Sequence, residues 1–454
     1  MSSEKESRPV GRRRVLKAAV LGAGVLGVAG VSTAAVADLR PWRPRGVAWF
    51  GAGGAVGTAA SSAPPAPPAA TTPRPSPSPS VTTASPRVKA GIVHPGTLHT
   101  RADFDRMAAK VTAGAQPWRA GWDRLVANPN SRSTYQPRPV ATVIRGGTGQ
   151  NYALLFRDVA AAYQNALRWK ITGDEAHGDK ARDILNAWSS TLTEVRGNAD
   201  RFLLAGTQGW QLAHVGEMMR GYPGFAQDRF RTMLLDHFYP LCDQFLTKHN
   251  DACITNYWAN WDLCVMAGIL AIGIFCDDQA KIDRVIEYFK TGAGNGSIMH
   301  AVPFLHPGGL AQWQESGRDQ GHTSGGIGHL GVFCQMAWNQ GHDLFGYADN
   351  RFLKGAEYVA RYNLGQEVPF TTYRWGTGQN CARREHTTIS AAARGINNPV
   401  WALLYNHYGV RRGLRVPNIE AYAARVGPEG GGGDYGPNSG GYDHLGFGTL
   451  TFTL

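Results

Sequence analysis

A helical period of apolar residues runs through most of the chain from Arg101 to Tyr408. It is clearest between Tyr152 and Leu167 and over 282–289, where apolar residues recur at three- and four-residue steps and fall on one helix face. The same spacing predicts helices over 178–195, 208–221, 225–247, 256–276, 324–341, 350–364 and 398–409. Short or Gly-containing connections favour antiparallel helix pairs, and a chain of this length can close such pairs into a ring. We therefore predict an all-α fold, an (α/α) toroid of antiparallel helix pairs.

The C-terminal residues depart from this period. Strand-like alternation is confined to 447–454, so the toroid is expected to end in a short irregular or β-like tail. The Gly-rich stretch 427–441 is expected to be a surface loop, because its glycines do not lead into a helix as a phosphate-binding loop would. The segment 256–276 is apolar on most sides, which predicts an inner helix. Its Asn256, Asn260 and Asp262 argue against a membrane span, since each would need a polar partner in hydrocarbon.

The N-terminal residues have the pattern of an export signal followed by a tether. Arg12-Arg13-Arg14-Val15-Leu16-Lys17 precedes a Gly/Ala/Val/Leu run that ends at Ala37, which is typical of a twin-arginine signal with a small-x-small cleavage site. Residues 38–90 are rich in Pro, Ala and Ser and cannot bury enough apolar surface to fold. We therefore divide the chain into an export signal (1–37), a disordered tether (38–90), a toroidal domain (91–410) and a Gly-rich tail packed on it (411–454).

This organisation predicts an exported protein that is secreted or held in the periplasm or cell envelope. It has no stable membrane span once the signal is cleaved, and an uncleaved signal anchor is the alternative. A monomer is expected.

The net charge of +12 does not indicate a nucleic-acid partner. Residues 1–90 contain 12 Lys or Arg and three Asp or Glu, which leaves 34 basic and 31 acidic residues in 91–454. The excess therefore lies outside the predicted domain. The six cysteines show no C-x-x-C spacing, so buried free thiols are expected, with a single disulfide outside the cell as the alternative. No cofactor or metal is expected, because no Cys/His cluster has ligand spacing.

Two polar segments are candidates for the functional site. The first is Thr255-Asn256-Tyr257-Trp258-Ala259-Asn260-Trp261-Asp262, which opens the apolar helix. Aromatic rings between amides suit a sugar, because the ring faces pack on it and the amides bond to its oxygens. Asn256 is either the N-cap of this helix or a functional residue, and with Asn260 it would lie on one helix face.

The second segment runs from Gln312 to His329 and is almost wholly polar, ionisable or glycine. It is predicted to be a loop between two apolar helices. Such a loop is either solvated and without a role, or it is an acid/base site. The second interpretation rests on Glu315, Arg318, Asp319 and His322, which are close together in sequence.

These motifs resemble the toroidal polysaccharide lyases of the alginate lyase and chondroitin lyase superfamily. The resemblance covers about residues 92–410 and rests on the order of its motifs, which are Leu98–Asp105, Gln211–Glu217, Asn256-Tyr257-Trp258, His322-Thr323-Ser324-Gly325-Gly326-Ile327-Gly328 and Trp401–Tyr408. It implies β-elimination of a uronic-acid polymer that is alginate-like or glucuronan-like. In that reaction a base takes the C5 proton, a neutralising group holds the C6 carboxylate and a proton donor assists departure of the C4 oxygen.

The resemblance also assigns residues. Asn256 matches the family's carboxylate-contacting asparagine, and Arg318 matches an arginine in the segment before its catalytic tyrosine. His322 stands where that tyrosine is usual, and a histidine can perform both proton transfers; Tyr257 could supply a phenol instead. The Asn-His pair of many alginate lyases is replaced here by Ile254-Thr255. We therefore expect the catalytic residues to be His322, Arg318, Asn256 and Tyr257.

The expected partner is an anionic polysaccharide. Substrate contacts are expected from Trp258, Asn260, Glu315, Gln320, Gln211, Trp210, His214, Tyr373 and His386.

Two other functions fit the same residues. Glu315 and Asp319 are four residues apart, and a helical turn would bring both carboxylates to one face, as a glycoside hydrolase needs. A tethered, non-catalytic glycan-binding protein would keep the aromatic and amide groups and lack turnover. Only a lyase releases a 4,5-unsaturated uronate, which absorbs ultraviolet light.

Overall fold

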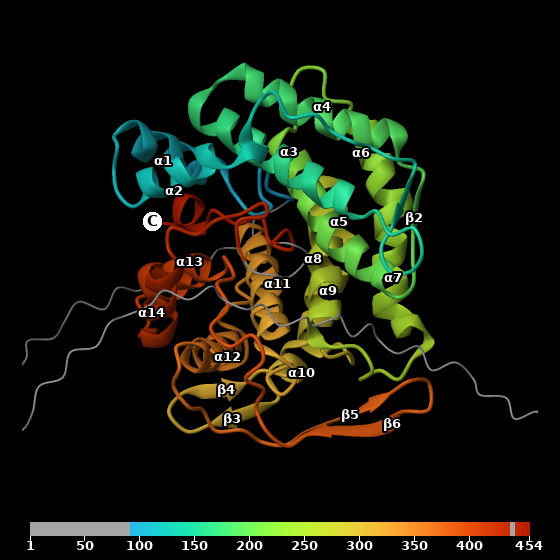
Figure 1. Cartoon of the computed structure of the whole chain (residues 1–454), viewed down its shortest axis with the longest axis vertical. Helices are drawn as coiled ribbons and strands as arrows, with labels where there is room; N and C mark the ends of the chain where they lie inside the picture. Colours follow the sequence, from blue (N-terminus) through green and yellow to red (C-terminus); the bar gives the residue numbers. More distant parts are fainter. Residues whose placement is uncertain (1–90, 436–440) are drawn as a thin grey trace, which may run out of the picture. The chain divides into compact units, whose positions relative to one another are not determined.

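The computed structural model describes residues 91–435 and 441–454, all of them in one unit (Figure 1). The export signal and tether predicted for 1–90 lie outside the described residues. The helices are α1 (Arg101–Thr112), α2 (Trp118–Ala127), α3 (Ala153–Thr172), α4 (Glu175–Thr191), α5 (Asp200–Met218), α6 (Gln227–Met233), α7 (Tyr239–Lys248), α8 (Ala259–Phe275), α9 (Gln279–Thr291), α10 (Ile298–Ala301), α11 (Gln320–Asn339), α12 (Tyr347–Asn363), α13 (Trp401–Leu404), α14 (Pro417–Val426) and α15 (Gly448–Thr451). Short 3-10 or π turns are η1 (Pro129–Ser131), η2 (Leu234–Phe238), η3 (His249–Asp251) and η4 (Tyr405–Arg411).

The described strands form three two-stranded sheets. Parallel β1 (Thr142–Ile144) and β2 (Glu194–Arg196) make the first sheet. Antiparallel β3 (Phe304–His306) and β4 (Leu310–Gln312) make the second, directly before the polar segment. The third is the antiparallel hairpin of β5 (Tyr373–Thr377) and β6 (Ala382–His386). The prediction that strands are confined to the C-terminus was therefore wrong.

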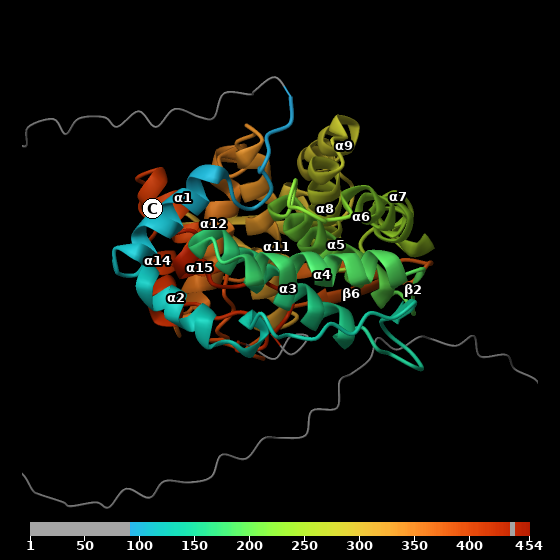
Figure 2. The ribbon, with the colours of Figure 1, turned by 90° about the horizontal axis from the view of Figure 1, so that it is seen from above.

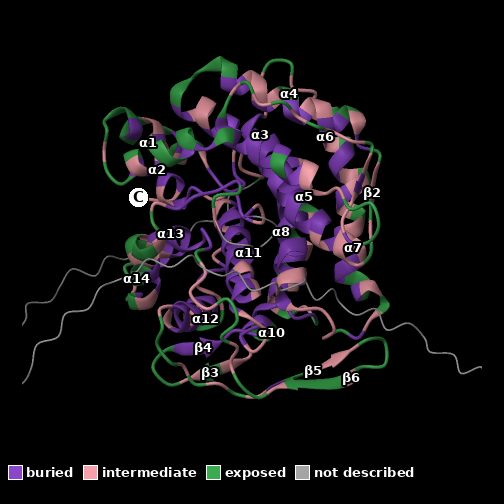
Figure 3. Cartoon of the chain, in the orientation of Figure 1, coloured by how far each residue is buried: buried purple, intermediate pink, exposed green. Residues whose placement is uncertain are grey.

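Helices α5, α8 and α11 form the centre of the fold, and Figure 3 shows all three largely buried. Helix α8 packs on both of the others, and every residue from Asp262 to Phe275 is buried. Helices α5 and α8 approach closely at glycines, because a Cβ built on Gly206 would lie 2.7 Å from the carbonyl carbon of Cys264. The predicted inner helix is thus confirmed. No helix in the described ranges is both long and apolar enough to cross a membrane.

Amphipathic helices pair with this centre. Helices α3 and α4 lie side by side (Figure 2) and are joined by Gly173, whose φ of 73° ends α3, and by Asp174, whose carboxylate caps α4. Helix α9 follows α8 after a short connection and is capped by Asp278. Its buried face is the one that the period predicted, namely Ile282, Val285, Ile286 and Phe289. The predicted all-α toroid of helix pairs is confirmed.

The helix expected over 225–247 is present as a continuous helical run from Gln227 to Lys248, in which the π turn η2 lies between α6 and α7. Two other local expectations were wrong. The last residues form the short helix α15 rather than a β-like tail. In the Gly-rich stretch, Glu429–Gly432 is buried instead of lying on the surface. Glycine permits this approach, since a Cβ at Gly432 would lie 2.2 Å from the amide nitrogen of Gln164.

Candidate active site

The polar segment Gln312–His329 is not a simple loop. A turn over 314–318 leads into α11, which begins at Gln320, and the carboxylate of Asp319 caps that helix by accepting the His322 N–H at 2.8 Å. The first helical turns are largely buried. Small residues allow this, because a Cβ on Gly326 would lie 2.9 Å from the Trp313 ring. The expectation of a loop at 320–323 was therefore wrong, whereas the helix predicted over 324–341 is present and begins four residues earlier, at Gln320.

Four ionisable side chains meet at the start of α11, and we call them the Arg318 cluster: Glu315, Arg318, Asp319 and His322. The Arg318 guanidinium donates to Glu315 Oε1 at 3.0 Å, and its Nη2 lies 3.1 Å from His322 Nε2. The other ring nitrogen, Nδ1 of His322, lies 2.6 Å from Asp319 Oδ2. The His322 side chain is 40% exposed and that of Glu315 is wholly buried, so His322 is the member most open to a ligand.

The environment sets the protonation states of both carboxyl groups. Burial raises the pKa of Glu315 to about 6, against the opposing charges of Arg318 and His322. Burial would also raise the pKa of Asp319, but its hydrogen bonds and ion pair with His322 outweigh burial and lower it. An ionised Asp319 accepts the Nδ1 proton of His322, which leaves Nε2 as the basic nitrogen of the neutral ring.

Three aromatic rings flank the Arg318 cluster, and we call them the aromatic wall: Trp258, Trp375 and His386. Trp258 stacks on His386 with ring centroids 5.6 Å apart and an interplanar angle of 4°. The guanidinium of Arg318 lies 5.2 Å from the Trp258 ring centroid, within the range of a cation–π interaction. Trp375 lies 4.6 Å from His386. Burial and the charge of Arg318 lower the pKa of His386, so this ring is neutral near neutral pH.

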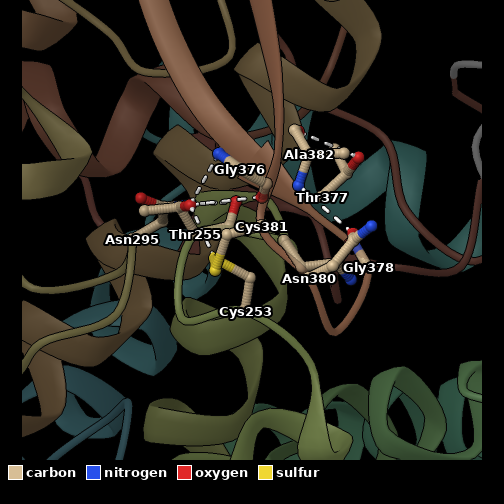
Figure 4. The surroundings of a disulfide bond; sticks show 10 residues. Cys253, Thr255, Asn295, Gly376, Thr377, Gly378, Asn380, Cys381 and Ala382 are labelled. Carbon is tan, nitrogen blue, oxygen red and sulfur yellow. Dashed lines mark hydrogen bonds between the residues drawn. A yellow bond between two sulfur atoms is a disulfide. The ribbon is translucent and has the colours of Figure 1, made fainter.

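A disulfide holds the β5–β6 hairpin against the segment before α8. Cys253 is bonded to Cys381, and Figure 4 shows the Thr255 hydroxyl between the Cys253 sulfur and the backbone of Gly376. The Thr255 hydroxyl accepts the Gly376 N–H at 2.9 Å and donates to the Gly376 carbonyl at 3.2 Å. The other four cysteines are free thiols. The hairpin that carries Trp375 and His386 is therefore fixed to the residues that carry Trp258.

Asn256 belongs to this hairpin contact. Its side-chain oxygen accepts the Gly378 N–H at 2.7 Å, at the hairpin turn. It is not the N-cap of α8, because that position is Trp258, and Ala259 donates its N–H to the Gln314 side chain. Asn256 therefore does not share a helix face with Asn260, whose side-chain oxygen is buried without a partner.

Tyr257 faces a different group of side chains. Its ring packs 4.6 Å from that of Trp261 and 5.1 Å from that of Phe245, and its hydroxyl accepts from Asn250 at 2.8 Å. Burial raises the pKa of Tyr257. None of these contacts is with the Arg318 cluster.

Two further candidates bond mainly to protein groups near the cluster. Gln320 donates to the carbonyls of Ser316 and Ser390 and accepts from Asn363. The Tyr373 hydroxyl accepts from Gln314 at 2.8 Å, and burial raises its pKa to about 12. Gln320 therefore stabilises the turn over 314–318, and Tyr373 joins β5 of the hairpin to the same turn.

The candidates on α5 lie in the core. Trp210 and His214 are fully buried, and Gln211 donates to the backbone carbonyls of Tyr442 and Asp443. Burial lowers the pKa of His214 well below its usual value, and its Nδ1 lies 2.8 Å from the Thr97 hydroxyl. The structure thus brings together Arg318, His322, Glu315, Trp258 and His386, while the α5 residues support the helix packing.

The sequence points to Asp319 as part of an acid/base site or as a hydrolytic carboxylate, and in the structure it orients His322 and caps α11. Trp375 is the one member of this site that the sequence analysis misses, although the alternation of Tyr373, Trp375 and Thr377 is a strand signal. No group of three or more His, Cys, Asp or Glu in the described part of the chain is placed to hold a metal ion.

Comparison with known proteins assigns the family. A family model described as alginate lyase matches residues 146–370. The chain belongs to the alginate lyase superfamily. The match includes α5, α8, α11 and the Arg318 cluster, and it ends before the β5–β6 hairpin. As a member of this superfamily, the protein is a polysaccharide lyase.

The chain is also similar to solved structures of alginate lyases. Alginate lyase A1-III from Sphingomonas species A1 is 12% identical, covers 73% of this chain and 92% of its own, and gives a TM-score of 0.46. An alginate lyase from Bacteroides ovatus is 11% identical, with coverage of 78% and 99% and a TM-score of 0.47. No curated protein sequence matches the chain.

The pKa of Glu315 predicts how stability changes with pH. A buried carboxyl whose pKa is about 6 in the fold and 4.5 in the unfolded chain favours the folded state when protonated, and this stability is lost as the pH rises from 4.5 through 6. The loss is about 2 kcal/mol. Glu315→Gln removes the titrating carboxyl group and with it this loss. As the pH rises from 4.5 to 7.5, the unfolding free energy of wild type should therefore fall by about 2 kcal/mol relative to that of the variant. Urea denaturation at several pH values measures this difference.

The matched control is Glu385→Gln, since the Glu385 side chain is 49% exposed. Its unfolding free energy should run parallel to that of wild type with pH. A parallel course for Glu315→Gln as well would contradict the assigned protonation.

Proposed function

We propose that this lyase cleaves a uronic-acid-containing polymer, alginate-like or glucuronan-like, by β-elimination at the Arg318 cluster. The observation that carries the proposal is the setting of His322. Its ring is held between Asp319 at 2.6 Å and Arg318 at 3.1 Å, and it is the most exposed of the four side chains. An oriented base beside a guanidinium is what removal of a proton next to a carboxylate requires.

Arg318 is suited to neutralise the substrate's C6 carboxylate. That charge must be masked, because the C5 proton is otherwise far too weakly acidic to be removed. The guanidinium offers five N–H donors, and Glu315 engages Nη1 while Nη2 faces His322. When a substrate carboxylate accepts from Nη2, the lone pair of His322 Nε2 is released from the guanidinium. In a single rearrangement, substrate binding would therefore free His322 Nε2 to act as the base and neutralise the substrate's C6 carboxylate.

His322 then performs both proton transfers. Nε2 takes the C5 proton, the C–H electron pair forms the C4–C5 double bond, and the C4–O bond breaks. The imidazolium, stabilised by Asp319, returns a proton to the departing C4 oxygen. Tyr257, whose hydroxyl bonds to Asn250, is not needed as the donor.

Space for a sugar lies on the same side of α11. A Cβ built on Gly325 would meet no atom within 4 Å, and Gly325 is three residues from His322 on the same helix face. Trp258 of the aromatic wall lies 5.2 Å from the Arg318 guanidinium, and an aromatic ring offers a surface on which a sugar packs.

The alternatives fit the contacts less well. Hydrolysis needs two carboxyl groups facing each other across the sugar. Here Glu315 is wholly buried against Arg318 and Asp319 bonds to His322, so neither faces open space opposite the other. A glycan-binding protein without activity would not need the oriented His322.

Product analysis tests the proposal. The protein is incubated with alginate, glucuronan, hyaluronan and chondroitin, and ultraviolet absorbance and reducing ends are followed together. At least one uronate polymer should give both signals in equal amounts, and the same polymer with its carboxyl groups reduced to alcohols should give neither. Reducing ends without absorbance would mean hydrolysis, and binding without either signal would mean a glycan-binding protein; both results would overturn the proposal.

Export of the protein remains part of the proposal. A polymer is too large to enter a cell unaided, and the Cys253–Cys381 disulfide fits an oxidising compartment. The twin-arginine route, signal cleavage and the monomeric state stay predictions.

A further inference from the structure

The β5–β6 hairpin has two chemically different faces. In the register of the ladder, Trp375 pairs with Arg384 and Tyr373 pairs with His386. Directly paired residues lie on the same face of a sheet and alternate residues share it. Trp375, His386 and Arg384 therefore project from the face that stacks on Trp258, and Arg374, Arg383 and Glu385 project from the opposite face.

Arg374 on the far face and Arg384 on the near face differ in their partners. On the far face, Arg374 donates to Glu385 at 3.0 Å. On the near face, Arg384 is exposed, and its one hydrogen bond is a 3.4 Å contact with the Arg383 carbonyl. Among the described residues it contacts no carboxylate. A guanidinium beside an aromatic ring, without an acidic partner, is the combination that binds a planar carboxylate on a sugar.

The hairpin is held firmly enough to present these groups. The Cys253–Cys381 disulfide, the Thr255 bonds to Gly376 and the Asn256 bond to Gly378 all fix it to the segment before α8. Along β6, Arg384 is two residues from His386, so the two residues lie about 7 Å apart along the strand. Since His386 stacks on Trp258 beside the Arg318 cluster, this displacement suits Arg384 to the sugar next to the one that reacts.

We propose that the near face of the β5–β6 hairpin is a second uronate subsite, in which Trp375 packs on the sugar ring and Arg384 pairs with its carboxylate. This inference rests on the proposed function, because it gives the lyase a contact with a neighbouring unit of the same polymer. It lies outside the residues that match the family model. It makes the hairpin a determinant of substrate specificity.

The test measures binding, so that it does not depend on turnover. Alginate and glucuronan oligosaccharides are titrated into the His322→Ala protein, and Arg384→Ala is compared with Arg383→Ala on that background. The two arginines are adjacent and both exposed, and they differ in face. Arg384→Ala should raise Kd about fivefold, and Arg383→Ala should change it less than twofold. Trp375→Ala should raise Kd about tenfold.

The carboxyl-reduced oligosaccharide separates charge from shape. With it, Arg384→Ala should have no effect on Kd, whereas Trp375→Ala should still weaken binding. Equal effects of Arg384→Ala and Arg383→Ala, no effect of Arg384→Ala, or no uronate binding at all would each overturn the subsite. If Arg384→Ala selectively weakens uronate binding but the wild-type protein yields no unsaturated product, the subsite is kept and the lyase mechanism is rejected.

Discussion

Replacing His322 with alanine is expected to lower kcat by a factor of about 10²–10⁴, the usual contribution of a general acid/base. The ring takes the C5 proton and returns one to the leaving oxygen, so its loss removes both transfers. Stability should change little, because the side chain is 40% exposed and the helix keeps its Asp319 cap. Initial rates of absorbance increase on the polymer identified by the product test measure kcat and KM.

The control for this variant is His237→Ala, in η2, whose imidazole makes no side-chain hydrogen bond within the described part of the chain. Its kcat should stay within twofold of wild type. Added imidazole should restore part of the rate of His322→Ala, since it can enter the space that the ring leaves. An unchanged kcat in His322→Ala would remove this residue from the mechanism.

Replacing Arg318 with alanine should lower kcat by a factor of about 10²–10³, the loss seen when one electrostatic donor to a developing charge is removed. The variant also leaves Glu315 buried without its partner, so the pKa of Glu315 should rise above the value of about 6 that it has beside Arg318. Activity and the pH dependence of unfolding are measured on the same samples. A lost rate together with a raised Glu315 pKa would show that the guanidinium serves both the substrate and the fold.

Arg318→Lys distinguishes charge from geometry. A lysine keeps the positive charge but cannot hold Glu315 and His322 with two parallel donors. Its kcat should fall nearly as far as that of Arg318→Ala. Arg374→Ala, on the far face of the hairpin, is the control and should keep the wild-type kcat. Recovery of most of the rate in Arg318→Lys would mean that charge alone is needed.

The helices could be predicted because their signal is local. Helix α9 places Ile282, Val285, Ile286 and Phe289 on one face, and nothing elsewhere in the chain is needed to find it. Helix α11 was harder, because its first turns carry polar residues that find partners far away in sequence. Gln320, for example, bonds to Asn363. A polar stretch with such partners looks like a loop until the partners are known.

The site was predicted in part for the same reason. Arg318 and His322 lie within one turn of sequence, so their association could be expected. The contact between Trp258 and His386 joins residues 128 positions apart, and no local sequence pattern predicts it. Asn256 was expected to reach the substrate through its amide, but the hairpin turn takes up its oxygen and Trp258 reaches the cluster instead.

The bond between Cys253 and Cys381 closes a covalent ring through the chain, because it joins two residues 128 positions apart. That ring contains α8, α11 and α12, and therefore the whole Arg318 cluster. The exposed stretch 365–367, between α12 and β5, also lies inside it. A protease that cuts once in this stretch would not separate the hairpin from the body of the enzyme, because the sulfur bridge would still join the two fragments. Such a nicked enzyme would run as a single species on a denaturing gel until a reductant was added.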